Sequence, residues 1–166
     1  GARVIRLSAP AFCDIAIDGQ NVRAGAGAKL VNLVSASVQA GLSGLEDLVG
    51  IPGTVGGGLV GNAAAHGSNL GQRIHSVKVM LPDGGTAERP RDELAFSSGW
   101  TNLDGSIMLS ARFDLDSDDP QLLTKRIQRT VPVEQAHQPT ATRTATPQVN
   151  APFAHPAETR RPPSPP

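Results

Sequence analysis

The sequence predicts an α+β fold, with a mixed, largely antiparallel sheet and helices packed on one side of it. Several short segments alternate apolar and polar residues and are separated by turn signals such as Asp18-Gly19, which is typical of strands joined by hairpins. Two longer segments, 30–38 and 120–131, instead place apolar residues at helical spacing. With 166 residues, the chain is long enough for one domain with a real core.

The N-terminal part is expected to form three strands and then a helix. Residues 4–7 begin as a strand, the alternation over 13–17 predicts a half-buried second strand, and 21–24 returns as a third. The apolar stripe of segment 30–38 predicts an amphipathic helix, and Gly41 is a suitable residue to end it.

A hairpin is expected in the middle of the chain, after a polar loop at 68–71. Residues 77–81 alternate as a strand, 82–85 (Pro-Asp-Gly-Gly) is a strong turn, and 86–88 returns as a short strand. Residues 91–94 are then expected to make one helical turn.

The last elements are a strand and a helix. Residues 99–105 are expected to be irregular, whereas 107–115 alternate most clearly in the whole chain. Acidic residues at 118 and 119 followed by Pro120 predict a helix start. The expected apolar stripe of this helix is Leu122, Leu123 and Ile127, and its expected solvated face is Lys125, Arg126 and Arg129.

The composition excludes several classes of protein. The formal net charge is zero, so nothing favours nucleic acid or an anionic membrane as a partner. Aromatic residues make up only 3%, too few for a base-stacking surface. No basic segment precedes an apolar run, and no apolar run reaches about 18 residues, so a soluble, cytoplasmic protein is expected.

Cysteine and histidine also limit the chemistry. Cys13 is the only cysteine, which excludes an internal disulfide and a cysteine-rich metal site, and it is expected to be a buried thiol on a strand. The four histidines show no metal-ligand spacing, so no metal site is predicted.

Residues 44–67 are dense in glycine yet carry almost no charge after Asp47. The spacers are apolar, unlike those of a flexible linker, so the backbone should be packed closely against something. Glycine lets main-chain N–H groups approach a ligand together, which suits a pyrophosphate. Pro52 before Gly53 predicts a defined turn. The alternative is a glycine-rich turn that serves close packing only.

This stretch resembles the flavin-binding segment of the UDP-N-acetylenolpyruvoylglucosamine reductase family, the FAD enzymes of bacterial peptidoglycan precursor synthesis. The matching residues read Gly-Leu-Glu at 44–46, Gly-Ile-Pro-Gly-Thr-Val-Gly-Gly at 50–57 and Asn-Ala-Ala-Ala-His-Gly at 62–67. The pattern is neither the Rossmann fingerprint nor a P-loop. The resemblance implies an FAD-binding type-2, vanillyl-alcohol-oxidase-like domain, with FAD as cofactor and NADPH as the family's reductant.

The resemblance also implies which residues line the flavin. They are Ile51, Pro52, Gly53, Thr54, Gly56, Gly57, Asn62, His66 and Gly67. His66 stands where the family has tyrosine, and it could contact the flavin or be a structural histidine. Weak or partial FAD occupancy is expected, because the family's Gly-Gly-Gly-Ser-Asn-type turn, which helps to hold the pyrophosphate, is absent from the sequence.

The family's catalytic residues do not recur, so no catalytic residue is predicted. Ser98-Gly99 replaces the Tyr-Arg whose arginine stabilises negative charge, and Phe96 alone remains of that motif. Ala151 stands at the position of the proton-donating serine, and Ala154 at that of a lysine. The family's glutamate would belong to a substrate domain that the chain lacks.

Residues 1–136 are therefore interpreted as the second half of a reductase-like FAD-binding domain. Residues 137–166, rich in Pro and Thr, are interpreted as a tail and a relic of the start of the substrate domain. The chain starts Gly1-Ala2, which suggests a fragment or a processed chain. Two alternatives to an inactive flavoprotein stay open: a non-enzymatic module that binds a nucleotide or a partner, and a subunit whose partner chain supplies the missing elements.

Overall fold

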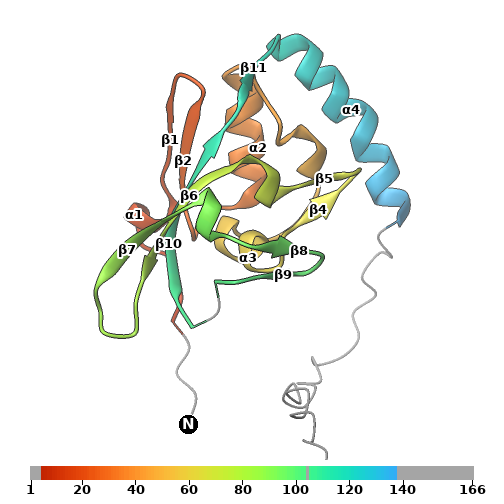
Figure 1. Ribbon diagram of the computed structural model, residues 1–166. Helices are drawn as coiled ribbons and strands as arrows, with labels where there is room; N and C mark the ends of the chain where they lie inside the picture. Colours follow the sequence, from red (N-terminus) through yellow and green to blue (C-terminus); the bar gives the residue numbers. More distant parts are fainter. Residues whose placement is uncertain (1–4, 104, 138–166) are drawn as a thin grey trace, which may run out of the picture.

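A five-stranded antiparallel sheet forms the centre of the computed structural model, which describes residues 5–103 and 105–137 (Figure 1). The strand order is β1-β2-β10-β6-β7, and each of the four pairings is antiparallel. The strands are β1 (Ile15–Asp18), β2 (Asn21–Gly25), β6 (Ile74–Met80), β7 (Thr86–Pro90) and β10 (Ile107–Asp114).

The central strand β10 pairs with β2 on one side and β6 on the other, so it joins the N-terminal hairpin to the middle one. Val22, Ala24, Val77 and Phe113 from these three strands are fully buried, and they belong to one apolar core together with residues of the helices. The α+β class and the largely antiparallel sheet are thus confirmed.

Three helices lie on the same side of the sheet in Figure 1: α2 (Leu30–Gln39), α3 (Val55–Val60) and α4 (Pro120–His137). The predicted end of α2 is confirmed, since Gly41 adopts the left-handed conformation at φ +71° just after the helix. The predicted start of α4 is confirmed too: a carboxylate oxygen of Asp119 accepts a hydrogen bond from Gln121 N at 2.7 Å.

The remaining elements are short. They are α1 (Pro10–Cys13), β3 (Leu42–Ser43), η1 (Glu46–Leu48), β4 (Ala64–Ala65), β5 (Ser68–Asn69), η2 (Leu70–Arg73), η3 (Arg91–Glu93), β8 (Phe96–Ser97), β9 (Trp100–Thr101) and β11 (Asp116–Ser117). The expected helical turn at 91–94 is confirmed as η3, and the 82–85 turn joins β6 to β7.

The first expected strand is wrong over the described residues. Residues 5–9 form no strand, and residue 4 lies outside the described ranges. Pro10 instead starts the short helix α1, which ends at Cys13. The Cys13 thiol is exposed rather than buried on a strand. Gly27 N donates to Phe12 O at 2.8 Å, so this segment crosses the end of β2 instead of extending the sheet.

Two segments expected to be irregular are ordered. The 68–71 stretch holds β5 and the start of η2, because Leu70 is fully buried and Asn69 and Gln72 form a reciprocal capping box. Part of 99–105 pairs as β9 with β8. Arg126 is not simply solvated, since it bonds Glu46 on η1 at 3.2 Å.

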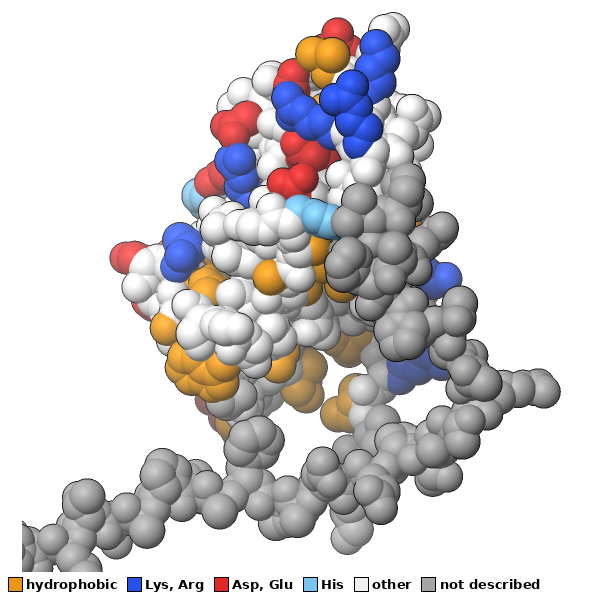
Figure 2. Space-filling model, turned by 90° about the vertical axis from the view of Figure 1, so that its right-hand side faces the viewer, with side chains coloured by type: hydrophobic (Ala, Val, Ile, Leu, Met, Phe, Trp, Pro, Cys, Tyr) orange, Lys and Arg blue, Asp and Glu red, His pale blue; other side chains and the backbone are white. Residues whose placement is uncertain are grey.

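On the face shown in Figure 2, basic and acidic side chains are intermixed over the upper part of the molecule, so they form no patch of a single sign there. Within the described ranges, no helix combines the length and apolarity needed to cross a membrane.

Candidate cofactor-binding site

The glycine-rich segment forms a turn followed by the short helix α3. Gly50 and Gly53 have φ of +88° and +119°, conformations that favour glycine, and they shape the turn around Pro52. Thr54 caps the helix: its hydroxyl oxygen accepts a hydrogen bond from Gly57 N at 3.3 Å. The segment is therefore a defined structure, as the Pro-Gly pair predicts.

The first N–H groups of α3 are bonded within the protein. Val55 N donates to Ala28 O at 2.9 Å, and Gly56 N donates to Ala26 O at 2.8 Å. Gly57 N is taken by the Thr54 hydroxyl. The expected cluster of N–H groups pointing together at a ligand is therefore wrong for these three donors, because the chain preceding α2 already satisfies two of them.

The two neighbouring glycines of α3 differ in their surroundings. A Cβ on Gly56 would lie 3.0 Å from Ala26 O and 3.1 Å from Ala26 Cβ, so this glycine permits close packing. A Cβ on Gly57 would meet only the Thr54 hydroxyl, at 3.5 Å, which is ordinary contact. Gly57 is exposed and leaves space on the side where the chain opens into a cavity.

That cavity has a volume of about 1120 Å³, slightly above the range of about 300–1,000 Å³ that is typical of small-molecule sites. Four segments line it, namely 5–8 with Cys13, 26–32, 54–60 and 106–108. The lining includes Arg6, Cys13, Lys29, Asn32, Thr54, Val60, Ile107 and Met108.

The cavity combines cations with an apolar wall. Arg6 and Lys29 line it, and none of the described lining residues is Asp or Glu. Neither cation has an ion-pair partner within the described part of the chain. Val60, Ile107 and Met108 supply apolar surface. Such a lining suits a ligand that joins an anionic group to a flat apolar one.

Of the nine residues predicted to contact flavin, Thr54, Gly56 and Gly57 line this cavity. The other six do not. Asn62 is 7% exposed, and its amide is used internally: Nδ2 donates to Ser97 O at 3.0 Å, and Oδ1 accepts from Gly71 N at 3.2 Å. In this structure the Asn62 side chain thus ties the end of α3 to β8 and η2.

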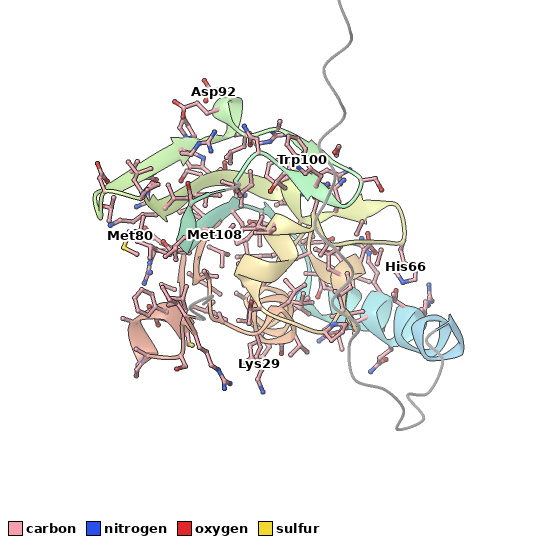
Figure 3. The ribbon with its side chains drawn as sticks, turned by 90° about the horizontal axis from the view of Figure 1, so that it is seen from below. Lys29, His66, Met80, Asp92, Trp100 and Met108 are labelled. Carbon is pink, nitrogen blue, oxygen red and sulfur yellow. The ribbon has the colours of Figure 1, made fainter. Side chains whose placement is uncertain are left out.

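His66 and Gly67 form the turn between β4 and β5, both with positive φ. Figure 3 shows His66 on the α4 side of the molecule, well away from Lys29. Ile51, Pro52 and Gly53 precede the capping residue and lie outside the cavity lining. The contacts of these residues with a flavin stay a prediction.

Most of the lining was not predicted from the sequence, including Arg6, Lys29, Asn32 and Met108. Arg6 and Lys29 belong to segments that the folded chain brings together, and neither stands in a motif. Met108 lies on β10, where periodicity predicts a strand but does not show which residues reach a cavity. The isolated bridge between Lys29 and Thr54 is what places the Lys29 backbone beside the cap of α3.

Ser98-Gly99, which the resemblance matches to the Tyr-Arg pair of the family, lies at the tip of the β8–β9 hairpin. Ser98 and Gly99 form its turn, with Gly99 at φ +72°, and Trp100 follows with 47% exposure. Figure 3 places Trp100 on the opposite side of the view from Lys29. Ala151 and Ala154 lie outside the described residues. No group of His, Cys, Asp and Glu in the described ranges could hold a metal ion.

Comparison with known proteins gives a consistent set of relatives. A family model described as an FAD binding domain matches residues 1–88. A UDP-N-acetylenolpyruvoylglucosamine reductase of Rhodopirellula baltica is 43% identical over 126 residues, which cover 76% of this chain and 41% of that protein. One from Halalkalibacterium halodurans is 36% identical over 115 residues, which cover 68% and 38%.

A solved structure has the same fold. The crystal structure of the UDP-N-acetylenolpyruvylglucosamine reductase from Thermus caldophilus superimposes with a TM-score of 0.65 at 31% identity, over 71% of this chain and 44% of that one. The chain thus spans less than half the length of each of these three relatives.

Proposed function

Since the chain belongs to the FAD binding domain family, with UDP-N-acetylenolpyruvoylglucosamine reductases as its relatives, we propose that its large cavity holds FAD. One observation carries the proposal: Thr54 and Gly57 of the glycine-rich motif open onto the same cavity as an apolar wall and two cations, Arg6 and Lys29. Sequence motif and cavity therefore point to one site.

The residues present fit the cofactor. The volume of about 1120 Å³ is large enough for a dinucleotide, and the bare Gly57 backbone leaves room for close approach. Val60, Ile107 and Met108 would contact the isoalloxazine ring, whereas Asn32 and the Thr54 hydroxyl would hydrogen-bond polar groups. Weak occupancy fits a site whose helix N–H groups are already used.

We further propose that this chain does not by itself reduce UDP-N-acetylenolpyruvoylglucosamine. FAD, when bound, supplies hydride transfer, with NADPH as the family's reductant. The protein would have to stabilise negative charge and donate a proton, and Ser98-Gly99 offers no cation at the position of the family's arginine. Losing such an electrostatic donor costs about 10²–10³ in rate, and losing a general acid costs about 10²–10⁴.

The test follows NADPH oxidation by the purified chain with added FAD and UDP-N-acetylenolpyruvoylglucosamine. No substrate-dependent oxidation is expected. The Gly99→Arg variant should not restore it, because Ala151 still offers no proton. Turnover at the rate of an ordinary reductase in the unmodified chain would contradict the proposal.

A second candidate is a non-enzymatic module that binds a nucleotide or a partner chain. It is favoured by the exposed apolar rim of the cavity, where Ile5 is 66% and Val60 48% exposed. Flavin fluorescence separates the two candidates. Saturable quenching on titration with FAD supports the flavoprotein, whereas no change at millimolar FAD leaves only the second.

A further inference from the structure

The anion-binding capacity of the cavity must come from side chains rather than from the α3 backbone. The N–H groups of Val55, Gly56 and Gly57 already have acceptors at 2.9, 2.8 and 3.3 Å. A phosphate in their place would have to break those bonds and leave the acceptors unsatisfied. The two cations at the cavity, Lys29 and Arg6, are therefore the groups that can neutralise an anionic ligand.

Lys29 occupies a position that local structure does not favour. It is the N-cap residue of α2, where Ser, Thr, Asp and Asn are preferred, and its side chain makes no capping hydrogen bond. A cation at a helix N-terminus also opposes the helix dipole. Its side chain is exposed and, in Figure 3, extends away from the body of the protein, so packing does not explain it either.

We propose that Lys29, assisted by Arg6, binds the diphosphate of the dinucleotide in this cavity and so selects FAD over flavins without phosphate. This inference rests on the proposed function and names the residues that recognise its ligand. The bridge to Thr54 holds the Lys29 backbone beside the α3 cap, and Lys29 and Gly57 both line the cavity. Lys29 then weakens the start of α2 but serves to bind the ligand.

The test compares FAD and riboflavin binding, by flavin fluorescence, to the full chain and to Lys29→Asn. FAD should bind about tenfold more weakly to the variant, the typical loss of one charged hydrogen bond at a partly exposed site. Riboflavin, which lacks phosphate, should bind both proteins equally. FAD affinity should also fall with rising salt in the wild type, and less so in the variant.

Three variants keep the result interpretable. Lys29→Asn introduces a good N-cap, so its urea midpoint should be unchanged or higher and unfolding cannot explain weaker binding. Lys29→Arg keeps the charge and should restore most of the affinity. Lys125→Gln removes an exposed lysine of α4 that does not line the cavity, and it should leave FAD binding unchanged.

The outcomes separate the two proposals. Equal FAD affinity of the wild type and Lys29→Asn would overturn the role of Lys29 and leave FAD binding intact. If the wild type bound no flavin, the proposed function would fail, and ADP would then test the anion site alone. ADP binding that is lost in Lys29→Asn would support the role of Lys29, and no ADP binding to the wild type would overturn it.

Discussion

Gly56 and Gly57 are adjacent in the glycine-rich motif but have different roles in the structure. The sequence predicts close packing of the backbone over the whole glycine-rich segment. The structure confirms a tight fit only at Gly56, where an added Cβ would lie 3.0 Å from Ala26 O and 3.1 Å from Ala26 Cβ. Gly57 has room for a methyl group, so its glycine is better explained by ligand access than by packing. No sequence pattern separates the two, because the difference depends on where residue 26 lies.

Alanine should therefore affect a different property at each position: the stability of the fold at 56 and the binding of FAD at 57. Both substitutions add similar helix propensity within α3, so the difference between them isolates the Ala26 contact. Gly56→Ala should be less stable than Gly57→Ala by about 1–3 kcal/mol, whereas Gly57→Ala should weaken FAD binding instead. Urea denaturation and FAD titration of both variants measure this. Equal urea midpoints of the two variants would show that the backbone near Ala26 shifts to accommodate the methyl group without loss of stability.

A second residue-scale prediction concerns Glu88 on β7. The Ser76 hydroxyl donates to its carboxylate at 2.7 Å, and Arg112 lies 3.8 Å from the same oxygen. The hydrogen bond first, and the charge of Arg112 second, lower the pKa of Glu88 below its ordinary 4.5. Because the folded state favours the carboxylate, this contribution is present above pH 4.5 and is lost as the pH falls through the lowered pKa.

The stability gap between the wild type and Glu88→Gln should consequently be largest near neutral pH. It should shrink as the pH is lowered from about 7 to about 2. Urea midpoints across that range measure the gap. A gap that stays constant into acid would mean that the carboxylate charge contributes nothing there.

At the scale of elements, α4 shows what periodicity can and cannot predict. The helix and its start at Pro120 are predicted correctly, since acidic residues, proline and an apolar stripe agree. The stripe itself is only partly right: Leu123 is fully buried, but Leu122 is 48% exposed. Arg126 bonds Glu46 across 80 residues of sequence, a partnership that no local pattern could predict.

The two leucines give a matched test of how α4 docks. Leu123→Ala should lower the free energy of unfolding by about 2–5 kcal/mol, because it removes a fully buried side chain. Leu122→Ala should change it by less than about 0.5 kcal/mol. Denaturant unfolding of both variants checks this. Similar losses in the two would mean that α4 packs through a different face.

The two hairpins β1–β2 and β6–β7 can be predicted from local sequence, because turn residues and alternating apolar residues mark both of them. The N-terminal segment cannot. Residues 5–7 are apolar enough for a strand, but the backbone of residues 7 and 12 packs against Gly27 and Gly25, and this contact places the segment across the sheet. These contacts join residues that are distant in sequence, so the local sequence predicts a strand that does not form.

At the scale of the whole molecule, the motif predicts the ligand but not the full site. The glycine-rich segment contributes Thr54, Gly56 and Gly57 to the cavity, whereas both cations come from segments without any motif. Asn62 belongs to the motif, yet its amide joins α3 to β8 and η2. The motif therefore includes residues that lie outside the proposed site, and the charged lining forms only where four segments of the chain meet.

Cys13 offers a direct probe of whether this cavity holds FAD. It is the only cysteine in the chain, its thiol is exposed, and it lines the cavity. The measurement is the rate at which a chromogenic disulfide reagent modifies the wild-type thiol as FAD is added. If FAD fills the cavity, the rate should fall several-fold and saturate at the same FAD concentration as the change in flavin fluorescence. Saturable FAD binding that leaves the rate unchanged would place the flavin elsewhere on the protein and contradict the proposed site.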